Sequence, residues 1–201
     1  MTLALIDYQA GNLHSVANAL RAAGCTDLTV TADPDVVARA DRIVLPGVGA
    51  FGACAAALRA IPAMVDALEQ RVLTQGAPFL GICVGMQLLA DTGEELGTHR
   101  GLGWIAGGVR RIDPAGSDAK VPHMGWNDVV PTAAHPLIVP GEAYFLHSYA
   151  FVGEGVAATT DHAGPVTAAI ARDTVLGVQF HPEKSQRYGL ALLERFLAWR
   201  P

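Results

Sequence analysis

A cysteine between two glycines is the clearest candidate for covalent chemistry in the sequence. Gly81-Ile82-Cys83-Val84-Gly85 is a G-x-C-x-G pattern, which lies between an apolar run that predicts a strand and a stretch that predicts a helix. In such a turn, a nucleophile elbow, the central residue is strained and its neighbours must be small. The dipole of the following helix would favour a thiolate. We therefore expect Cys83 to be a nucleophile. The alternative, a buried inert thiol, is what we expect for Cys25 and Cys54.

A histidine and a glutamate late in the chain could serve such a nucleophile. A thiol needs a base, and the base needs a group that orients it. In Phe180-His181-Pro182-Glu183 the proline favours extended backbone at His181, where residues two apart point the same way. Glu183 could then hold one imidazole nitrogen while the other faces Cys83. The alternative is an exposed histidine beside a solvated glutamate, but the strand predicted over residues 174–180 would deliver the motif to a sheet end.

A glycine-rich segment, Pro46-Gly47-Val48-Gly49-Ala50-Phe51-Gly52, follows another predicted strand. Because glycines leave the backbone there uncovered by side chains, its N–H groups can point toward a developing oxyanion. We expect the N–H groups of Gly49 and Val84 to hold that oxyanion. The same run matches the G-x-G-x-x-G dinucleotide pattern, so NAD binding is a rival interpretation. It is disfavoured because the run is not on the first strand and the nearest acidic residue, Asp66, falls in a helical stretch.

The elements that must position these residues alternate along the first half of the chain. We expect strands at 3–6, 42–45 and 78–82, and helices at 13–23, at 84–90 and over a long alanine-rich stretch interrupted near Pro62. After residue 100, short β-prone runs predict antiparallel or mixed additions to the same sheet, and residues 188–199 predict a closing helix. The prediction is a single α/β domain over residues 1–201, with a central mixed, largely parallel sheet flanked by helices.

Composition excludes several classes of protein. With 51% hydrophobic and 16% charged residues, the chain has ample apolar surface to bury. A net charge of -5 and no basic run disfavour a nucleic-acid or membrane surface, and no apolar run or leader pattern indicates a membrane helix or signal peptide. Three cysteines without a C-x-x-C pair fit a reducing cytoplasm. We expect no metal and no cofactor, because the histidines form no ligand-spaced cluster.

Taken together, the motifs resemble the class I glutamine amidotransferases, and among them most closely the branch of glutaminase subunits of imidazole glycerol phosphate synthase. The likeness covers essentially the whole chain, through IDYQAGNL (6–13), LPGVGAFG (45–52), GICVGMQLL (81–89), GLGW (101–104), VPHMGWN (121–127), YFLHSY (144–149) and GVQFHPEKS (177–185). The PHMGWN and YFLHSY segments are the ones more particular to this branch. One departure is Gln9-Ala10, where a glycine after the tyrosine is more usual.

The resemblance implies glutamine hydrolysis by a triad of Cys83, His181 and Glu183 through a γ-glutamyl thioester. It further implies a set of residues that position glutamine: Gln87, Glu95, Ser148 and Tyr149. Glu94 could align in place of Glu95. From the residues alone, Gln87 could instead be a helix-surface residue, and Tyr149 could be a half-buried strand residue that only packs.

The resemblance also implies a partner. Ammonia would pass to a separate cyclase subunit, a (β/α)8 barrel, which makes imidazole glycerol phosphate and an aminoimidazole carboxamide ribonucleotide. The partner-facing residues of this heterodimer would be Asn12, Met124, Trp126, Asn127, Tyr144 and Lys184. Members of the family are nearly idle without their partner, and a peptide flip in the PGVG loop (46–49) is a plausible switch.

Two other classes of function stay open at this stage. One is a stand-alone thiol hydrolase of the same fold, such as a γ-glutamyl hydrolase, which would have no use for an exposed MGWN segment (124–127). The other is a nucleotide-binding or structural α/β protein in which Cys83 is inert. Trp126 itself could also be simple core packing.

Overall fold

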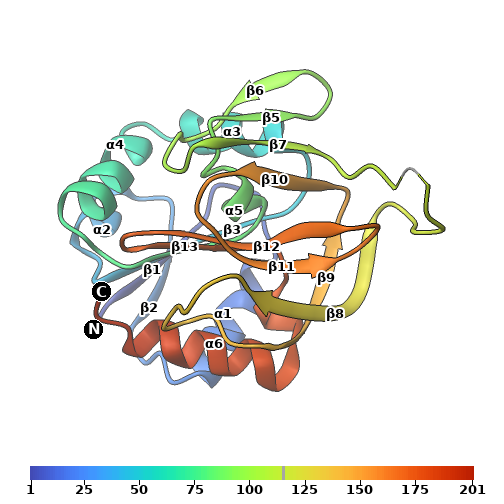
Figure 1. Ribbon diagram of the computed structural model, residues 1–201. Helices are drawn as coiled ribbons and strands as arrows, with labels where there is room; N and C mark the ends of the chain where they lie inside the picture. Colours follow the sequence, from blue (N-terminus) through green and yellow to red (C-terminus); the bar gives the residue numbers. More distant parts are fainter. Residues whose placement is uncertain (115) are drawn as a thin grey trace.

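The computed structural model describes residues 1–114 and 116–201 of the chain, and within them nine strands form the main sheet (Figure 1). Their order is β2-β1-β3-β4-β13-β12-β11-β8-β9. The first five pair in parallel and the remainder are antiparallel. The strands are β1 (Leu3–Ile6), β2 (Leu28–Thr31), β3 (Arg42–Gly47), β4 (Phe79–Cys83), β8 (His123–Pro131), β9 (Gly141–His147), β11 (Val156–Asp161), β12 (Pro165–Arg172) and β13 (Val175–Val178).

Helices cover both faces of this sheet, as Figure 1 shows. On one side α1 (Leu13–Ala22) packs against α6 (Gln186–Ala198), and on the other α4 (Met64–Glu69) contacts α2 (Pro34–Arg39) and α3 (Phe51–Ala60). A π-helical turn, Gln70–Thr74, extends α4. Within the described residues no single helix is long and apolar enough to cross a membrane, and one pair of helices bent by 93°, Phe51–Ala60 and Met64–Thr74, reaches that length and composition only together.

A second sheet lies beside α3 (Figure 1). Its strands are β10 (Tyr149–Gly153), β7 (Gly107–Arg111), β5 (Thr92–Glu94) and β6 (Thr98–Arg100), in that order. The prediction that all later β-prone runs join one sheet is wrong for β7 and β10. Residues 143–151 look like one continuous β-prone run, but the chain leaves the main sheet at Ser148, so β9 and β10 belong to different sheets.

The structure confirms the predicted mixed sheet flanked by helices and corrects several boundaries. The helix expected at 84–90 is only α5 (Val84–Gln87), because the carbonyls of residues 88–90 accept hydrogen bonds from the backbone of residues 102–105. β3 runs on through Pro46 and Gly47 instead of ending before them. β2 and α2 were not predicted; β2 lacks an apolar pattern because it is an edge strand with three of its four residues outside the core.

Candidate active site

Cys83 is the last residue of β4 and the first turn of α5 follows it directly. Its backbone has φ 54° and ψ -112°, a conformation that costs a non-glycine residue free energy. The flanking glycines have no room for a side chain. A Cβ on Gly81 would lie 2.6 Å from the carbonyl oxygen of Gly85, and a Cβ on Gly85 would lie 1.9 Å from that of Leu45. The strained strand-to-helix turn expected from the G-x-C-x-G pattern is therefore present.

The parallel pairing of β4 with β13 brings His181 to Cys83. Val178 lies opposite Ile82 in this register, so the chain that leaves β13 reaches the same sheet edge as the elbow. The His181 ring lines the same cavity as Cys83 and interacts with its side chain electrostatically, and its Nδ1 lies 2.8 Å from Oε1 of Glu183. His181 itself is extended, as predicted, with φ -99° and ψ 98°, but the extended backbone does not continue to Glu183. Pro182–Lys184 is a 3-10 turn, and it is this turn that folds Glu183 back onto the imidazole.

The pKa of His181 follows from these contacts. Burial alone would lower it, but the interactions with Cys83 and Glu183 outweigh that effect and raise the pKa to about 9. The imidazole is therefore protonated at neutral pH, and it carries a proton that it can donate.

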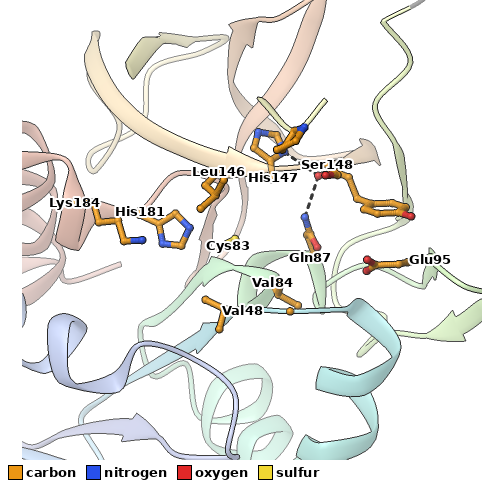
Figure 2. Close-up of a pocket in the computed structure, with 13 residues that line it drawn as sticks. Val48, Cys83, Val84, Gln87, Glu95, Leu146, His147, Ser148, His181 and Lys184 are labelled. Carbon is orange, nitrogen blue, oxygen red and sulfur yellow. Dashed lines mark hydrogen bonds between the residues drawn. The ribbon is translucent and has the colours of Figure 1, made fainter. Parts of the chain in front are cut away.

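A cavity of about 310 Å³ opens in front of Cys83 (Figure 2). All the residues expected to hold the oxyanion or glutamine line it, together with Cys83 and His181: Gly49, Val84, Gln87, Glu95, Ser148 and Tyr149. In Figure 2, His181 and Lys184 lie on one side of Cys83, and Gln87 and Glu95 on the other. The cavity is large enough for a small molecule such as an amino acid.

Two ambiguities about these lining residues are resolved by their contacts. Gln87 is buried, and its Nε2 donates 3.0 Å hydrogen bonds to the carbonyl of Tyr149 and to Oε1 of Gln179, so it is not a helix-surface residue. Glu95 faces the cavity, whereas Glu94 lies outside it and pairs with Arg110 at 3.4 Å on the surface. Glu95 is therefore the one of the two that can contact a ligand here.

The glycine-rich segment connects β3 to α3 and forms one wall of the cavity. Gly49 has φ +101°, a conformation that favours glycine. Side-chain donors hold two carbonyls of this glycine-rich segment. The Tyr8 hydroxyl donates to the carbonyl of Pro46 at 2.7 Å, and the Cys54 thiol donates to that of Val48 at 3.4 Å. The dinucleotide interpretation gains no support, since Asp66 lies within α4 and not at a strand end.

An exposed apolar patch borders the cavity on one face of the β8–β9 hairpin. We define it by Met124, Trp126, Tyr144 and Leu146, which pair across the strands as Met124 with Leu146 and Trp126 with Tyr144. Met124 is 66% exposed and Trp126 47%, so Trp126 is not core packing. Leu146 also lines the cavity, as does Lys184, whose Nζ lies 6.0 Å from the centre of the Tyr144 ring. The patch and the cavity are therefore contiguous.

The two asparagines expected to face a partner have contacts within the chain. Asn12 caps α1, where its side chain accepts a 3.3 Å hydrogen bond from the N–H of Ser15. The amide of Asn127 lies 3.1 Å from Nε2 of His123 and donates to the carbonyl of Asp161. It alternates with Trp126 along β8 and so points away from the apolar patch. A partner-facing role for either residue stays a prediction.

Comparisons with known proteins identify the family of the chain. The family model of the class I glutamine amidotransferases matches residues 4–199. The chain belongs to this family. It is 64% identical to the imidazole glycerol phosphate synthase subunit HisH of Zymomonas mobilis, over 100% of this chain and 97% of that one. It is 53% identical to the subunit of the same name in Ruegeria pomeroyi, over the full length of both.

Solved structures of other glutamine amidotransferases share the fold at low sequence identity. A crystal structure described as a glutamine amidotransferase superposes with a TM-score of 0.76 at 19% identity, over 98% of each chain. The structure of PurLQS from Thermotoga maritima gives a TM-score of 0.71 at 17% identity, over 98% of this chain and 97% of that one. At these identities the likeness shows the class I amidotransferase fold alone.

Sequence reasoning about this amidotransferase missed two buried polar residues near the cysteine. Gln179 has no exposed surface, and its Nε2 lies 3.7 Å from the Cys83 sulfur. His147 lines the cavity and is hydrogen-bonded to His123. A signal for Gln179 was available, because it is the one polar side chain in the apolar run 175–180. His147 gave no comparable signal, because its partner lies 24 residues away on another strand.

Proposed function

We propose that the chain is the glutaminase subunit of an imidazole glycerol phosphate synthase in histidine biosynthesis. It would hydrolyse glutamine to glutamate and ammonia through Cys83, His181 and Glu183, and pass the ammonia to a cyclase subunit. The observation that carries the proposal is the sequence of contacts from Cys83 to His181 and on to Glu183, at a strained elbow facing a cavity. The names of the two relatives described above support the assignment to this synthase.

In the first half of the reaction the Cys83 thiolate attacks the carboxamide carbon of the glutamine side chain. The carbonyl oxygen becomes an oxyanion, which the N–H groups of Gly49 and Val84 would hold. Protonated His181 then gives its proton to the amide nitrogen, the C–N bond breaks and ammonia leaves. The product on the protein is a γ-glutamyl thioester of Cys83.

In the second half a water molecule attacks the thioester carbon. His181, now neutral, takes a proton from this water, and Glu183 stabilises the imidazolium that re-forms. The C–S bond breaks, glutamate is released and Cys83 returns to its starting state. The sum of both halves is glutamine plus water giving glutamate plus ammonia, with no cofactor required.

The amino-acid part of glutamine would lie along the wall made by Gln87, Glu95, Ser148 and Tyr149. Glu95 supplies a negative charge that suits the α-ammonium group. Gln87 supplies an amide beside the same cavity, and its hydrogen bonds to Tyr149 and Gln179 fix its orientation. This arrangement would place the side-chain carboxamide toward Cys83.

The apolar patch of Met124, Trp126, Tyr144 and Leu146 is the proposed contact with the cyclase subunit. Exposed aromatic and methionine side chains are frequent anchors of protein interfaces. Because Leu146 and Lys184 belong to the cavity wall as well, a partner seated here would cover the cavity mouth. Ammonia released at Cys83 would then leave toward the partner and not into bulk water.

The decisive experiment compares glutamate formation from glutamine by the isolated chain and by the chain with its cyclase subunit. We expect low activity alone, strong stimulation by the partner, and loss of all activity in Cys83→Ala with partner binding retained. Cys25→Ala is the matched control, because Cys25 is an equally buried free cysteine that does not line the cavity. Full activity of Cys83→Ala would refute the nucleophile. High activity of the isolated chain, unchanged by the partner, would indicate a stand-alone thiol hydrolase.

A further inference from the structure

A buried chain of hydrogen bonds connects the sulfur of Cys83 to strands β8 and β9. From Cys83 it runs through Gln179 and Gln87 to the backbone carbonyl of Tyr149, with separations of 3.7, 3.0 and 3.0 Å. From the same carbonyl a second arm runs through Nδ1 of His147 and on to His123, at 2.9 and 3.0 Å. The two dashed bonds in Figure 2 are those that meet at this carbonyl, one from Gln87 and one from His147.

The carbonyl of Tyr149 fixes the direction of the first arm. A carbonyl oxygen only accepts hydrogen bonds, so the group of Gln87 that faces it is the NH2 group. The same NH2 group donates to Oε1 of Gln179. Because its oxygen is thus occupied as an acceptor, Gln179 presents its own NH2 group to the sulfur of Cys83. Gln179 is therefore the donor in its contact with the sulfur of Cys83. A thiolate can only accept a hydrogen bond, so this is the direction that a thiolate requires.

The second arm has one direction as well. Nδ1 of His147 must carry a proton to donate to the carbonyl of Tyr149. Burial lowers the pKa of His147 to about 3 and that of His123 to about 4, so both rings are neutral at neutral pH. Nε2 of His147 therefore accepts, and Nδ1 of His123 donates to it. Nε2 of His123 is then left as an acceptor.

Asn127 at the far end of the second arm provides an independent check. Its Nδ2 donates to the carbonyl of Asp161 at 2.8 Å, and its Oδ1 accepts from the N–H of Asp128 at 2.9 Å. These backbone contacts fix the amide without reference to the histidines. They leave Nδ2 facing Nε2 of His123 at 3.1 Å, which is the donor that the neutral ring requires. The contacts at Tyr149 and at Asn127 therefore require the same direction for the hydrogen bonds of the second arm.

We propose that Gln179 is a further residue of the active site, which donates a hydrogen bond to the reacting sulfur of Cys83 while it fixes the amide of Gln87. The His123–His147 pair acts through Tyr149 as a positioning unit for the same network. The inference rests on the proposed function in that Cys83 is taken as the nucleophile. A sulfur that has the imidazolium of His181 and the amide donor of Gln179 as neighbours has its negative charge stabilised by both groups. Gln179 is fully buried, so its amide has no water to bond with when the sulfur does not accept from it.

The test is the rate of alkylation of Cys83 by iodoacetamide as a function of pH, located by mass spectrometry of the Cys83 peptide. Gln179→Leu removes the donor, and Gln179→Glu keeps the size of the side chain but puts an acidic group beside the sulfur. We expect a higher apparent pKa of the thiol and roughly tenfold slower alkylation at pH 7 for Gln179→Leu, and a larger effect for Gln179→Glu. Both variants should lower kcat with glutamine more than they raise KM.

Thr167→Val is the matched control. The Thr167 hydroxyl is buried and donates a 2.7 Å hydrogen bond to the carbonyl of Phe151, but Thr167 does not line the cavity. This variant loses one buried hydrogen bond, whereas Gln179→Leu loses two, and it should alkylate like the wild type. If Gln179→Leu fails to fold, the nearly isosteric Gln179→Glu carries the test, with circular dichroism as the check of folding.

The outcomes separate this inference from the proposed function, because alkylation needs no glutamine turnover. Altered thiol reactivity in the Gln179 variants of a chain without glutaminase activity would support the contact and refute the proposed function. Alkylation profiles of both Gln179 variants within about twofold of Thr167→Val, in a chain that hydrolyses glutamine, would overturn the role of Gln179 and leave the proposed function standing.

Discussion

The carboxylate of Glu95 accepts a 2.8 Å hydrogen bond from the backbone N–H of Phe51, the first residue of α3. The residue that precedes this helix, Ala50, provides no side-chain cap, so a glutamate from the segment between β5 and β6 does so instead. The negative charge also complements the positive end of the helix dipole. Because the PGVG loop leads directly into α3, Glu95 connects the glutamine cavity to the loop that would hold the oxyanion.

Replacing Glu95 should therefore affect both binding and stability. For Glu95→Ala we expect the KM for glutamine to rise at least tenfold, because the counter-charge for the substrate ammonium group is lost. The free energy of unfolding should fall by about 1 kcal/mol with the lost helix cap. Steady-state kinetics and urea denaturation measure the two effects. Glu94→Ala is the control, since its exposed contact with Arg110 should contribute less than about 0.5 kcal/mol. An unchanged KM in Glu95→Ala would exclude it from the glutamine site.

The three buried histidines His181, His123 and His147 should lose their protons at widely different pH values. The pKa of His181 is raised to about 9, whereas burial lowers those of His123 and His147 to about 4 and about 3. NMR spectra of a 15N-histidine-labelled sample, assigned with His→Gln variants, should show His181 losing its proton near pH 9. His123 and His147 should stay neutral down to pH 5. A midpoint near 6.5 for His181 would contradict its contacts with Cys83 and Glu183.

The same shift predicts how stability depends on pH. A histidine whose pKa is higher in the folded than in the unfolded chain stabilises the fold most where both states are protonated. For His181 this contribution is fully present below about pH 6.5, the ordinary value, and is lost as the pH rises through about 9. The slope is at most about 1.4 kcal/mol per pH unit. Urea denaturation from pH 6 to 9.5 should show this loss in the wild type and a smaller one in His181→Gln.

The parts of the site that could be predicted from sequence are those set by local backbone chemistry. The two glycines around Cys83 and the strand-to-helix junction are readable because no side chain fits at either glycine. His181 and Glu183 were found because they stand two apart beside a proline. The extended backbone predicted at His181 is present, but the 3-10 turn that follows and places Glu183 on the imidazole does not show in the β-like pattern around it.

What the sequence did not reveal depends on partners far apart along the chain. Whether β10 continues the main sheet is decided by its pairing with β7, about 40 residues earlier, and not by its own pattern. Gln179 is the polar residue of an apolar run, but its role depends on Cys83, which is 96 residues away. Asn127 lies within the partner-like MGWN segment, yet the alternation of β8 turns it to the opposite face from Trp126. Such contacts follow from tertiary packing and not from local pattern.

Trp126 should be an anchor of the partner contact without being needed for folding. It is 47% exposed, and its ring meets that of Tyr144 edge-on at 6.2 Å. We expect Trp126→Ala to weaken binding of the cyclase subunit at least tenfold and to change the free energy of unfolding by less than about 1 kcal/mol. Isothermal titration calorimetry measures the affinity. Val152→Ala removes an exposed apolar side chain on β10 and should leave affinity unchanged. Equal affinities for both variants would place the partner elsewhere.

The elbow itself should tolerate no side chain at Gly85. A Cβ there would lie 1.9 Å from the carbonyl oxygen of Leu45, which belongs to the backbone of the neighbouring strand β3 and cannot rotate away. We expect Gly85→Ala to lower the free energy of unfolding by about 3 kcal/mol or more. Because relief of the clash requires α5 to move, any folded fraction should also show slower alkylation of Cys83.

Gly108→Ala is the control for this substitution. Gly108 lies in β7 without a positive φ, and its nearest contact would be the Thr92 hydroxyl at an ordinary 3.5 Å. The free energy of unfolding of Gly108→Ala should differ from that of the wild type by less than about 1 kcal/mol, since a compatible glycine-to-alanine change mainly restricts the unfolded chain. Differential scanning calorimetry of the two variants compares them directly. Equal unfolding temperatures for Gly85→Ala and Gly108→Ala would mean that the backbone near Gly85 can shift to accept a side chain. The strained geometry at Cys83 would then not depend on the close approach of α5 to β3.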